Sequence, residues 1–478
     1  MLFHTWTFVL FFLIVYPVYL ATKGTWFKLP WLLAASYVFY GWWNPLYLLL
    51  ILFATTVDYL AVVMMSRSQR RKLWVAFSVA INLSLLGFFK YAGFVTESLN
   101  ALLASRGASY ALPAPDILLP VGISFFIFQS MSYSIDYYRG QVAKEPSFIR
   151  YATFVSLFPQ LVAGPIERAS HLLPQLHEEA KITREDIADG LSLFIVGLFK
   201  KLALADCLAL YVDKVYDAPA NFQAPALILA TVAFGWQIYF DFSGYTDMAR
   251  GIGRMMGIRL MLNFNNPYLA TSLGDFWKRW HISLSTWFKD YVYIPLGGNR
   301  GGSARTYVNM ALTMVISGLW HGASWTFVAW GALHALGRVA TRWLEATPFY
   351  EHRIPTFAKR AGVYAFVTFA WIFFRARSFA DAWLIVRRIF RGPWVDPQLD
   401  LRAVGLFRYV MMAVSQAKLP LLALGLVLAV WAYQWVYESR LRWALAPSPV
   451  RVGLVIFMAL YIAVFARAAG QPFIYFQF

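Results

Sequence analysis

The hydrophobic residues of this chain occur in long, nearly uninterrupted runs that are separated by short polar segments. A helix needs about 20 apolar residues to cross a bilayer, and about eleven runs come near that length and apolarity. They cover residues 5–21, 30–43, 46–66, 73–89, 117–135, 187–210, 222–243, 307–335, 362–374, 418–437 and 450–466. The pattern predicts an all-α polytopic membrane protein with about eleven transmembrane helices.

The basic residues between the runs predict how the chain is oriented in the membrane. Arg67, Arg70, Arg71 and Lys72 form the densest basic cluster, and such loops favour the cytosolic side. Counting back from this loop places the N-terminus on the outer face. Near the other end, Arg440, Arg442 and Arg451 place the loop 438–449 inside, so the last span leads the C-terminus to the outer face. This second count places the arginine-rich segment 377–405 outside, against the same rule, and a single misassigned span would remove that conflict.

The composition supports a membrane protein and argues against other classes. Hydrophobic residues make up 60% of the chain and charged residues only 14%, whereas a soluble domain is about 25% charged. The net charge of +18 needs no nucleic-acid partner, because the basic residues gather between spans and no recognition motif accompanies them. Cys207 is the only cysteine, so an internal disulfide is impossible and a cysteine-based metal site is not expected.

No low-complexity tract, long linker or clear internal repeat divides the sequence, which favours a single domain over residues 1–478. Residues 165–187 are polar with an amphipathic spacing, and they predict a helix that lies on the membrane surface without crossing it.

His321 is the residue that most clearly suggests chemistry. It lies inside the apolar run 307–335, and an ionisable side chain at membrane depth is costly, so a functional role is the first hypothesis. The alternative is a neutral, buried histidine whose two ring nitrogens are satisfied. On a single helix, His334 would be about 20 Å away from His321. We therefore interpret His334 as a packing or boundary residue.

Residues 263–302 are too polar to face lipid and too aromatic for a free loop. If residues 273–290 form one helix, then Lys278, His281 and Ser285 share a face. The segment is either a polar re-entrant element that lines a water-filled funnel or an amphipathic helix at the membrane interface.

Three smaller motifs have two interpretations each. On a helix, Asp275 and Arg279 would form an ion pair at i, i+4. The turn GGNRGG at residues 297–302 presents backbone N–H groups to a phosphate or simply joins two segments. Asp241 and Asp247 border a span and need partners, so they either anchor basic side chains of residues 278–300 or take part in proton transfer.

Several long motifs, in order along nearly the whole chain, resemble the membrane-bound O-acyltransferases, and in particular the bacterial polysaccharide branch that includes the alginate O-acetylases. The similarity is greatest in the core region 119–335. The motifs are ASYVFYGWW, LPVGISFFIFQSMSYSIDYYRG, FPQLVAGPIER, YFDFSGYTDMA, FWKRWHISLSTWFKDYVYIPLGGNR and LWHGASWTFVAWGALHA.

The resemblance implies a ring of spans around a thinned centre, with re-entrant or interfacial helices and a funnel from each side. It implies that His321, which follows Trp320 in the motif W-H-G, is catalytic, and that His281 is the second functional histidine. The donor would be a cytosolic thioester such as acetyl-CoA, with no bound cofactor and no metal. Lys278, Arg279 and Arg300 are then candidates for holding donor phosphates.

The aromatic tail 471–478 adds a candidate acyl relay, because related systems carry a similar tail with a tyrosine on the outer face. Tyr475 would accept the acyl group with His321 as its base, or it would only anchor the tail at the membrane interface. A periplasmic or membrane-anchored acetyltransferase is the implied partner that passes the acyl group to the polysaccharide.

The resulting prediction is an O-acyltransferase of the bacterial inner membrane that O-acetylates an exported, alginate-like polysaccharide. Peptidoglycan and teichoic acid are alternative acceptors. A transporter and a non-catalytic scaffold remain alternatives of a different class, although the paired half-repeats that many transporters show are not visible.

Overall fold

The computed structural model describes residues 1–162, 164–392, 394, 421–465 and 473–474, and these residues form helices with no strand among them. Within these described ranges, five helices are long and apolar enough to cross a membrane. They are α3 (Tyr47–Arg67), the continuous segment Arg71–Ser105, α12 (Ala224–Met255), α18 (Thr356–Arg375) and α22 (Ser448–Phe465). The predicted all-α membrane fold is confirmed, whereas the count of eleven spans and the ring arrangement stay predictions.

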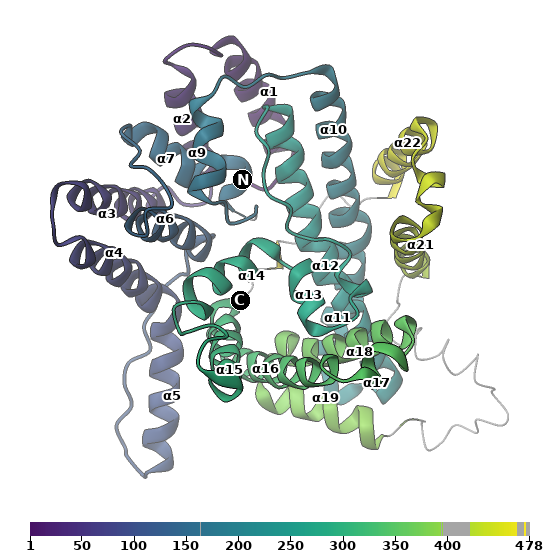
Figure 1. Ribbon diagram of the computed structural model, residues 1–478. Coiled ribbons are helices and arrows are strands. Elements are labelled where there is room, and N and C mark those ends of the chain that lie inside the picture. Colours follow the sequence, from purple (N-terminus) through teal and green to yellow (C-terminus); the bar gives the residue numbers. More distant parts are fainter. Residues whose placement is uncertain (163, 393, 395–420, 466–472, 475–478) are drawn as a thin grey trace. The chain divides into compact units, whose positions relative to one another are not determined.

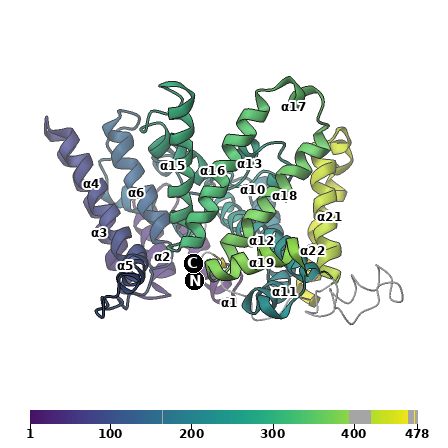
Figure 2. The same ribbon diagram turned by 90° about the horizontal axis from the view of Figure 1, so that it is seen from below.

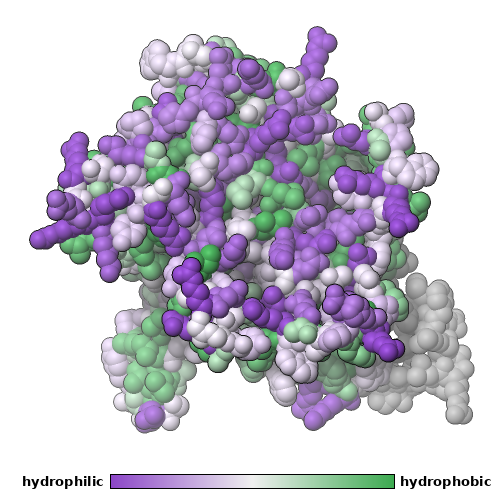
Figure 3. Space-filling model, viewed as in Figure 1, coloured by the Kyte–Doolittle hydropathy of each residue, from purple (hydrophilic) through white to green (hydrophobic). Residues whose placement is uncertain are grey.

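The segment Arg71–Ser105 consists of α4 (Arg71–Leu86), a π-helical turn at Gly87–Tyr91 and α5 (Ala92–Ser105). Hydrophobic side chains cover α5 in Figure 3, and Val95 and Leu102 are each half exposed. An apolar surface of this kind is suited to lipid contact, because lipid chains are as apolar as the side chains themselves.

The helices group into two compact units, and each unit is assembled from separate parts of the chain. The first contains Met1–Phe194 and Tyr245–Met261, and the second contains Ile195–Gly244 and Leu262–Phe478. Helix α12 supplies residues to both. The prediction of a single domain over residues 1–478 is not tested by this division.

The first unit contains the N-terminal helices. In Figure 1, α3 and α4 lie beside α6 (Ile123–Tyr138), and α7 (Phe148–Ser156) packs against α2 (Lys28–Gly41). Its other helices are α1 (Trp6–Ala21), α8 (Phe158–Leu161) and α9 (Ala169–His177), and α10 (Arg184–Phe199) begins here. The predicted surface helix at 165–187 is thus divided between α9 and the start of α10, and its place in the membrane stays a prediction.

A buried carboxylate joins three helices of this unit. Asp58 on α3 accepts hydrogen bonds from Ser78 and Asn82 on α4 and from Ser130 on α6. A buried acid is costly unless such donors surround it, so this network fixes how the three helices pack.

The second unit holds both candidate histidines. Its helices are α11 (Asp206–Asp217), the first part of α12, α13 (Leu273–Arg279), α14 (Ile282–Phe288), α15 (Gly302–His321), α16 (Trp325–Glu345), α17 (Pro348–His352), α18, α19 (Phe379–Arg391), α21 (Leu421–Glu438) and α22. Figure 2 shows α15, α16 and α18 next to one another, in agreement with their contacts.

The run 307–335, predicted as one span, is two helices packed against each other. Helix α15 ends at His321, Gly322 is extended, and Ser324 caps the start of α16 by accepting a hydrogen bond from the Thr326 amide. The backbones approach closely at Gly318, where an added Cβ would lie 2.3 Å from the Phe327 carbonyl oxygen. The prediction was wrong because hydropathy does not register a break made by small, uncharged residues.

Candidate active site

His321 is enclosed by aromatic rings from three positions in the second unit. It is the last residue of α15, and only 2% of its surface is exposed. The centroid of its ring lies 5.0 Å from that of Trp320, 5.1 Å from that of Trp330 on α16 and 5.4 Å from that of Phe374 on α18. The close packing of α15, α16 and α18 therefore builds the walls around this imidazole.

His281 lies between α13 and α14, where the chain does not continue as a helix. Trp280 is extended, and His281 adopts a left-handed conformation with φ of 45°. Residues 273–290 therefore do not form the single helix on which a shared face of Lys278, His281 and Ser285 depended.

Asn263 explains the break, because it supplies hydrogen bonds that replace those of a continuous helix. Its carbonyl oxygen accepts from the Ile282 amide at 2.9 Å. Its side-chain oxygen accepts from the amide and the hydroxyl of Ser283 and lies 3.2 Å from Nδ1 of His281. The left-handed turn at His281 is stabilised in this way, and the imidazole points into the core.

The two histidines lie close together. Their ring centroids are 6.4 Å apart, and Trp320 contacts both rings. Burial lowers the pKa of His281 from its ordinary value of 6.5 to about 3. His281 is consequently a neutral imidazole at physiological pH, able to accept a proton at one ring nitrogen and donate at the other.

His334 is buried as well, on the second helix of the hairpin. It sits on α16 between Trp330 and Trp277, with ring centroids 4.7 and 5.1 Å away. Within the described part of the chain, neither of its ring nitrogens has a hydrogen-bond partner. The separation of about 20 Å between His334 and His321 holds only for a single helix. The two histidines instead lie on different helices, and both contact Trp330.

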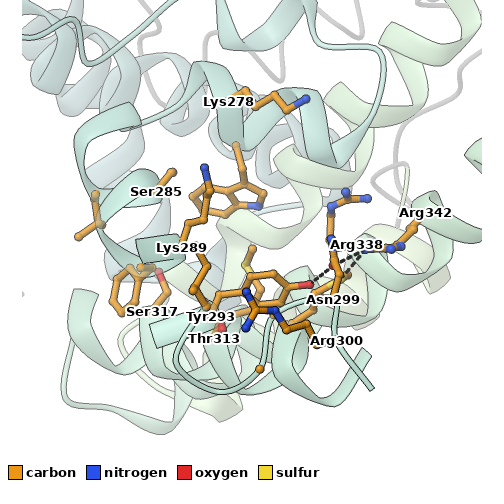
Figure 4. A pocket seen from close by; sticks show the side chains of 18 residues that line it. Lys278, Ser285, Lys289, Tyr293, Asn299, Arg300, Thr313, Ser317, Arg338 and Arg342 are labelled. Atoms are coloured by element: carbon orange, nitrogen blue, oxygen red, sulfur yellow. Dashed lines mark hydrogen bonds between the residues drawn. The ribbon is translucent and has the colours of Figure 1, made fainter. Parts of the chain in front are cut away.

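A pocket of about 670 Å³ lies beside this aromatic cluster in the second unit. Figure 4 shows its polar side chains, which come from α13, α14, the π-helical turn Lys289–Tyr293, the turn at residues 297–300, α15 and α16. Among the described residues that line it there is no carboxylate. Five are cationic: Lys278, Lys289, Arg300, Arg338 and Arg342.

The pocket reaches the aromatic wall of the histidine site at two points. Trp277 lines the pocket and contacts Trp330 at 5.8 Å, and Phe288 lines it and contacts Trp320 at 6.5 Å. Both tryptophans contact His321. On each of these two routes, two aromatic rings in succession lie between the cationic pocket and the imidazole.

The three predicted donor-binding cations have different positions. Lys278 and Arg300 line the pocket, but Arg279 is not among its lining residues. The guanidinium of Arg279 forms ion pairs with Asp275 at 2.8 Å, as the i, i+4 spacing predicted, and with Glu438 at 2.5 Å. Its charge is thus matched by two carboxylates.

The two acids of YFDFSGYTDMA have separate environments. Asp241 is buried and pairs with Lys201 at 2.6 Å, so the expected basic partner from residues 278–300 was wrong for this acid. Asp247, which belongs to the first unit, lies 3.6 Å from Arg250. Lys201 was missed, although a lysine inside the apolar run 187–210 is itself a signal.

Other residues of the site could not be recognised from the sequence. Lys289, Arg338 and Arg342 line the pocket, while Trp330 and Phe374 enclose His321. Aromatic and basic residues are frequent throughout this chain, and only the helix packing singles these out. Among the described residues, no group of three or more His, Cys, Asp or Glu side chains could hold a metal ion.

The candidate relay residue Tyr475 lies outside the described residues. The two residues before it are described, and both Phe473 and Ile474 are buried. Phe473 contacts Phe242 at 5.5 Å, and Phe242 contacts His281 at 4.6 Å. Phe473, two positions before Tyr475, therefore belongs to the same aromatic core as His281.

The chain is similar to proteins of one membrane enzyme family. The model of the membrane-bound O-acyltransferase (MBOAT) family matches residues 139–383. The probable alginate O-acetylase AlgI of Azotobacter vinelandii is 41% identical over 80% of this chain and 78% of its own length. AlgI of Pseudomonas putida is 35% identical over 100% of both chains, and the Helicobacter pylori peptidoglycan O-acetyltransferase is 36% identical over 76% of this chain and 74% of its own.

The chain belongs to the membrane-bound O-acyltransferase family. It is accordingly an O-acyltransferase, an enzyme of the class that the motifs around His281 and His321 predicted.

Proposed function

We propose that this enzyme takes an acetyl group from a cytosolic thioester, such as acetyl-CoA, and delivers it for O-acetylation of an exported, alginate-like polysaccharide. The names of the Azotobacter and Pseudomonas relatives support alginate as the acceptor. The Helicobacter relative, named a peptidoglycan O-acetyltransferase, supports peptidoglycan as a second candidate.

The observation that carries the proposal is the carboxylate-free cationic pocket beside the buried histidine pair. Lysine and arginine side chains form charge-assisted hydrogen bonds with phosphate, and a coenzyme A thioester carries several phosphate groups on its nucleotide end. Lys278 and Arg300, both pocket residues, would hold those groups, with the acyl end directed toward the aromatic rings and His321.

At the reacting end, His321 is the general base or the transient acyl acceptor. The C–S bond of the thioester breaks, the acyl carbon bonds to the attacking oxygen or ring nitrogen, and the proton of the attacking group goes to the leaving thiolate. Neutral His281, 6.4 Å away between ring centroids, would orient the donor or share the proton.

Tyr475 is the proposed next acceptor. A phenol has an ordinary pKa of about 10 and is a poor nucleophile unless a base is near. The burial of Phe473 and Ile474 in the histidine core supports a tail that brings this phenol to the base. A periplasmic or membrane-anchored acetyltransferase would then move the acetyl group to the polymer.

This transfer requires access from two sides of a membrane. We place the enzyme in the bacterial inner membrane with both termini on the outer face, and with about eleven spans around a thinned centre. Two termini on one face require an even number of spans, so the count is one more or one fewer than the eleven apolar runs. In that arrangement the acetyl group crosses the membrane while the donor stays in the cytosol.

Donor binding can be tested with purified enzyme and acetyl-CoA. We expect Lys278→Gln and Arg300→Gln each to raise the KM for acetyl-CoA by about ten- to hundredfold, the effect of losing one charged hydrogen bond, with a smaller change in kcat. Lys359→Gln is the control, because Lys359 is outside the pocket and donates to the Glu351 carbonyl. Equal KM values in all three variants would contradict the assignment of the pocket.

A further inference from the structure

A buried ion pair in the second unit is not used by the acyl-transfer chemistry described above. Nζ of Lys201 lies 2.6 Å from Asp241 and 2.8 Å from Asp206. The side chains of Lys201 and Asp241 are 1% and 3% exposed. Removing two charges from water so completely is costly in free energy. A gain in stability is therefore a weak explanation for this ion pair, and another role is worth seeking.

The second oxygen of Asp241 has a partner from the far end of the chain. Oδ1 pairs with Lys201, while Oδ2 accepts a hydrogen bond of 2.6 Å from the backbone N–H of Ile474. Ile474 is 233 positions away in sequence. A hydrogen bond from an amide to a carboxylate is among the stronger ones in proteins, and here it is shielded from water.

Apolar contacts reinforce this attachment. Phe473 is fully buried and Ile474 nearly so. The ring of Phe473 packs on Phe242, the residue after Asp241, and Phe242 packs edge-to-face on His281. The carboxylate that holds the C-terminal segment and the ring that supports it are therefore neighbours in α12, next to one of the two histidines.

We propose that Asp241, oriented by Lys201, is the docking site for the enzyme's own C-terminal segment and a positioning residue for the transfer step. The backbone amide of Ile474 is the group it recognises. Lys201 pairs with Oδ1 of the carboxylate, which leaves Oδ2 turned to that amide. The positioning role rests on the proposed function, whereas the docking itself does not.

Docking can be measured without activity, by thiol accessibility in the intact protein. In a Cys207→Ser background, Ile474→Cys places a thiol at the buried position while its backbone N–H is kept. We expect slow maleimide labelling of this thiol, and an increase of about tenfold or more when Lys201→Met and Asp241→Leu are added, since a charged hydrogen bond is lost. Changing both residues leaves neither Lys201 nor Asp241 as an unpaired buried charge. Asp206, the second partner of Lys201, is 14% exposed and keeps access to solvent.

Asp206→Asn is the matched control for labelling. It removes the other carboxylate partner of Lys201 but leaves the Asp241–Ile474 hydrogen bond. A thiol at Ala230→Cys, which is fully buried in the same unit, reports general unfolding. An unchanged labelling rate in the double variant, an equal rise with Asp206→Asn, or an equal rise at position 230 would each overturn the docking site.

The positioning role is tested with labelled acetyl-CoA in the Lys201→Met, Asp241→Leu variant. We expect thioester cleavage to keep its KM, while the rate of acetyl transfer to the acceptor falls by about tenfold or more. Transfer at the wild-type rate, despite faster labelling, would overturn the role. If the wild-type enzyme cleaves no thioester, the proposed function fails, and the labelling result still decides the docking site.

Discussion

His321 and His334 are buried side chains of the same type in one helical hairpin, yet their surroundings differ. His321 lies 6.4 Å from the second histidine between ring centroids, whereas the rings that pack around His334 include those of Trp277 and Trp330. Burial alone therefore does not distinguish the candidate catalytic histidine. The feature that distinguishes His321 is a second titratable ring nearby, the imidazole of His281.

This contrast predicts the effect of replacing His334. An unpartnered buried polar group costs about 1–3 kcal/mol, so His334→Leu should leave thermal stability unchanged or raise it, and acyl transfer should continue. The measurement is thermal unfolding in detergent together with acetyl transfer by the same sample. Loss of transfer from a protein that is still folded would show that His334 takes part in the reaction.

His281 predicts a pH dependence of stability. Its pKa is about 3 in the folded protein and near 6.5 when unfolded, so below pH 6.5 the unfolded chain binds a proton that the folded chain does not. The stability from neutral His281 is present above pH 6.5 and is lost as the pH falls toward 3, by at most about 1.4 kcal/mol per pH unit.

The measurement compares unfolding of the wild type and His281→Gln between pH 7.5 and 4.5, a range set by these two pKa values. The difference in unfolding free energy between the two proteins should shrink as the pH falls. A constant difference would mean that the imidazole is solvated or paired in a way that leaves its pKa ordinary.

At the scale of elements, the α15–α16 hairpin positions His321, and its geometry depends on Gly318. A Cβ there would lie 2.3 Å from the Phe327 carbonyl oxygen, so Gly318→Ala should force the helices apart. We expect a loss of about 1–3 kcal/mol in stability and reduced acyl transfer. Gly453→Ala on α22 is the control, because no described atom lies within 4 Å of its added Cβ. Equal behaviour of the two variants would contradict this packing.

How far the sequence predicts these elements depends on what interrupts them. The apolar runs that became α3, α12 and α22 were recognised, because long stretches of apolar residues are a sufficient signal. The breaks at Trp280–His281 and at Gly322 were missed, since the first depends on hydrogen bonds from Asn263 and the second on a glycine and a serine cap. Such breaks are decided by tertiary partners.

The candidate site was only partly predicted, because tertiary contacts decide which of its residues come together. His281 and His321 stand out in sequence as ionisable residues in aromatic or apolar surroundings, and the structure brings them together. Lys278 and Arg300 line the pocket as well, but so do Lys289 and Arg338, and spacing gives no means of choosing among the many basic residues. The pairing of Lys201 with Asp241 joins segments forty positions apart, and no local pattern reveals it.

At the scale of the whole molecule, the proposed mechanism predicts sidedness. Acetyl-CoA does not cross membranes, so inverted inner-membrane vesicles, which expose the cytosolic face, should cleave it. Intact spheroplasts, which expose the outer face, should not cleave it until detergent is added. The measurement is release of free thiol in each preparation. Cleavage by sealed spheroplasts would place the donor site on the outer face and contradict the proposed orientation.

The central claim is that His321 performs acyl transfer, and purified enzyme with acetyl-labelled acetyl-CoA tests it most directly. Wild type and His334→Leu should release free coenzyme A, while His321→Ala should be slower by about a hundredfold or more, the usual effect of removing a general base or nucleophile. If His321→Ala cleaves the thioester as fast as wild type, His321 is a packing residue and the account is contradicted.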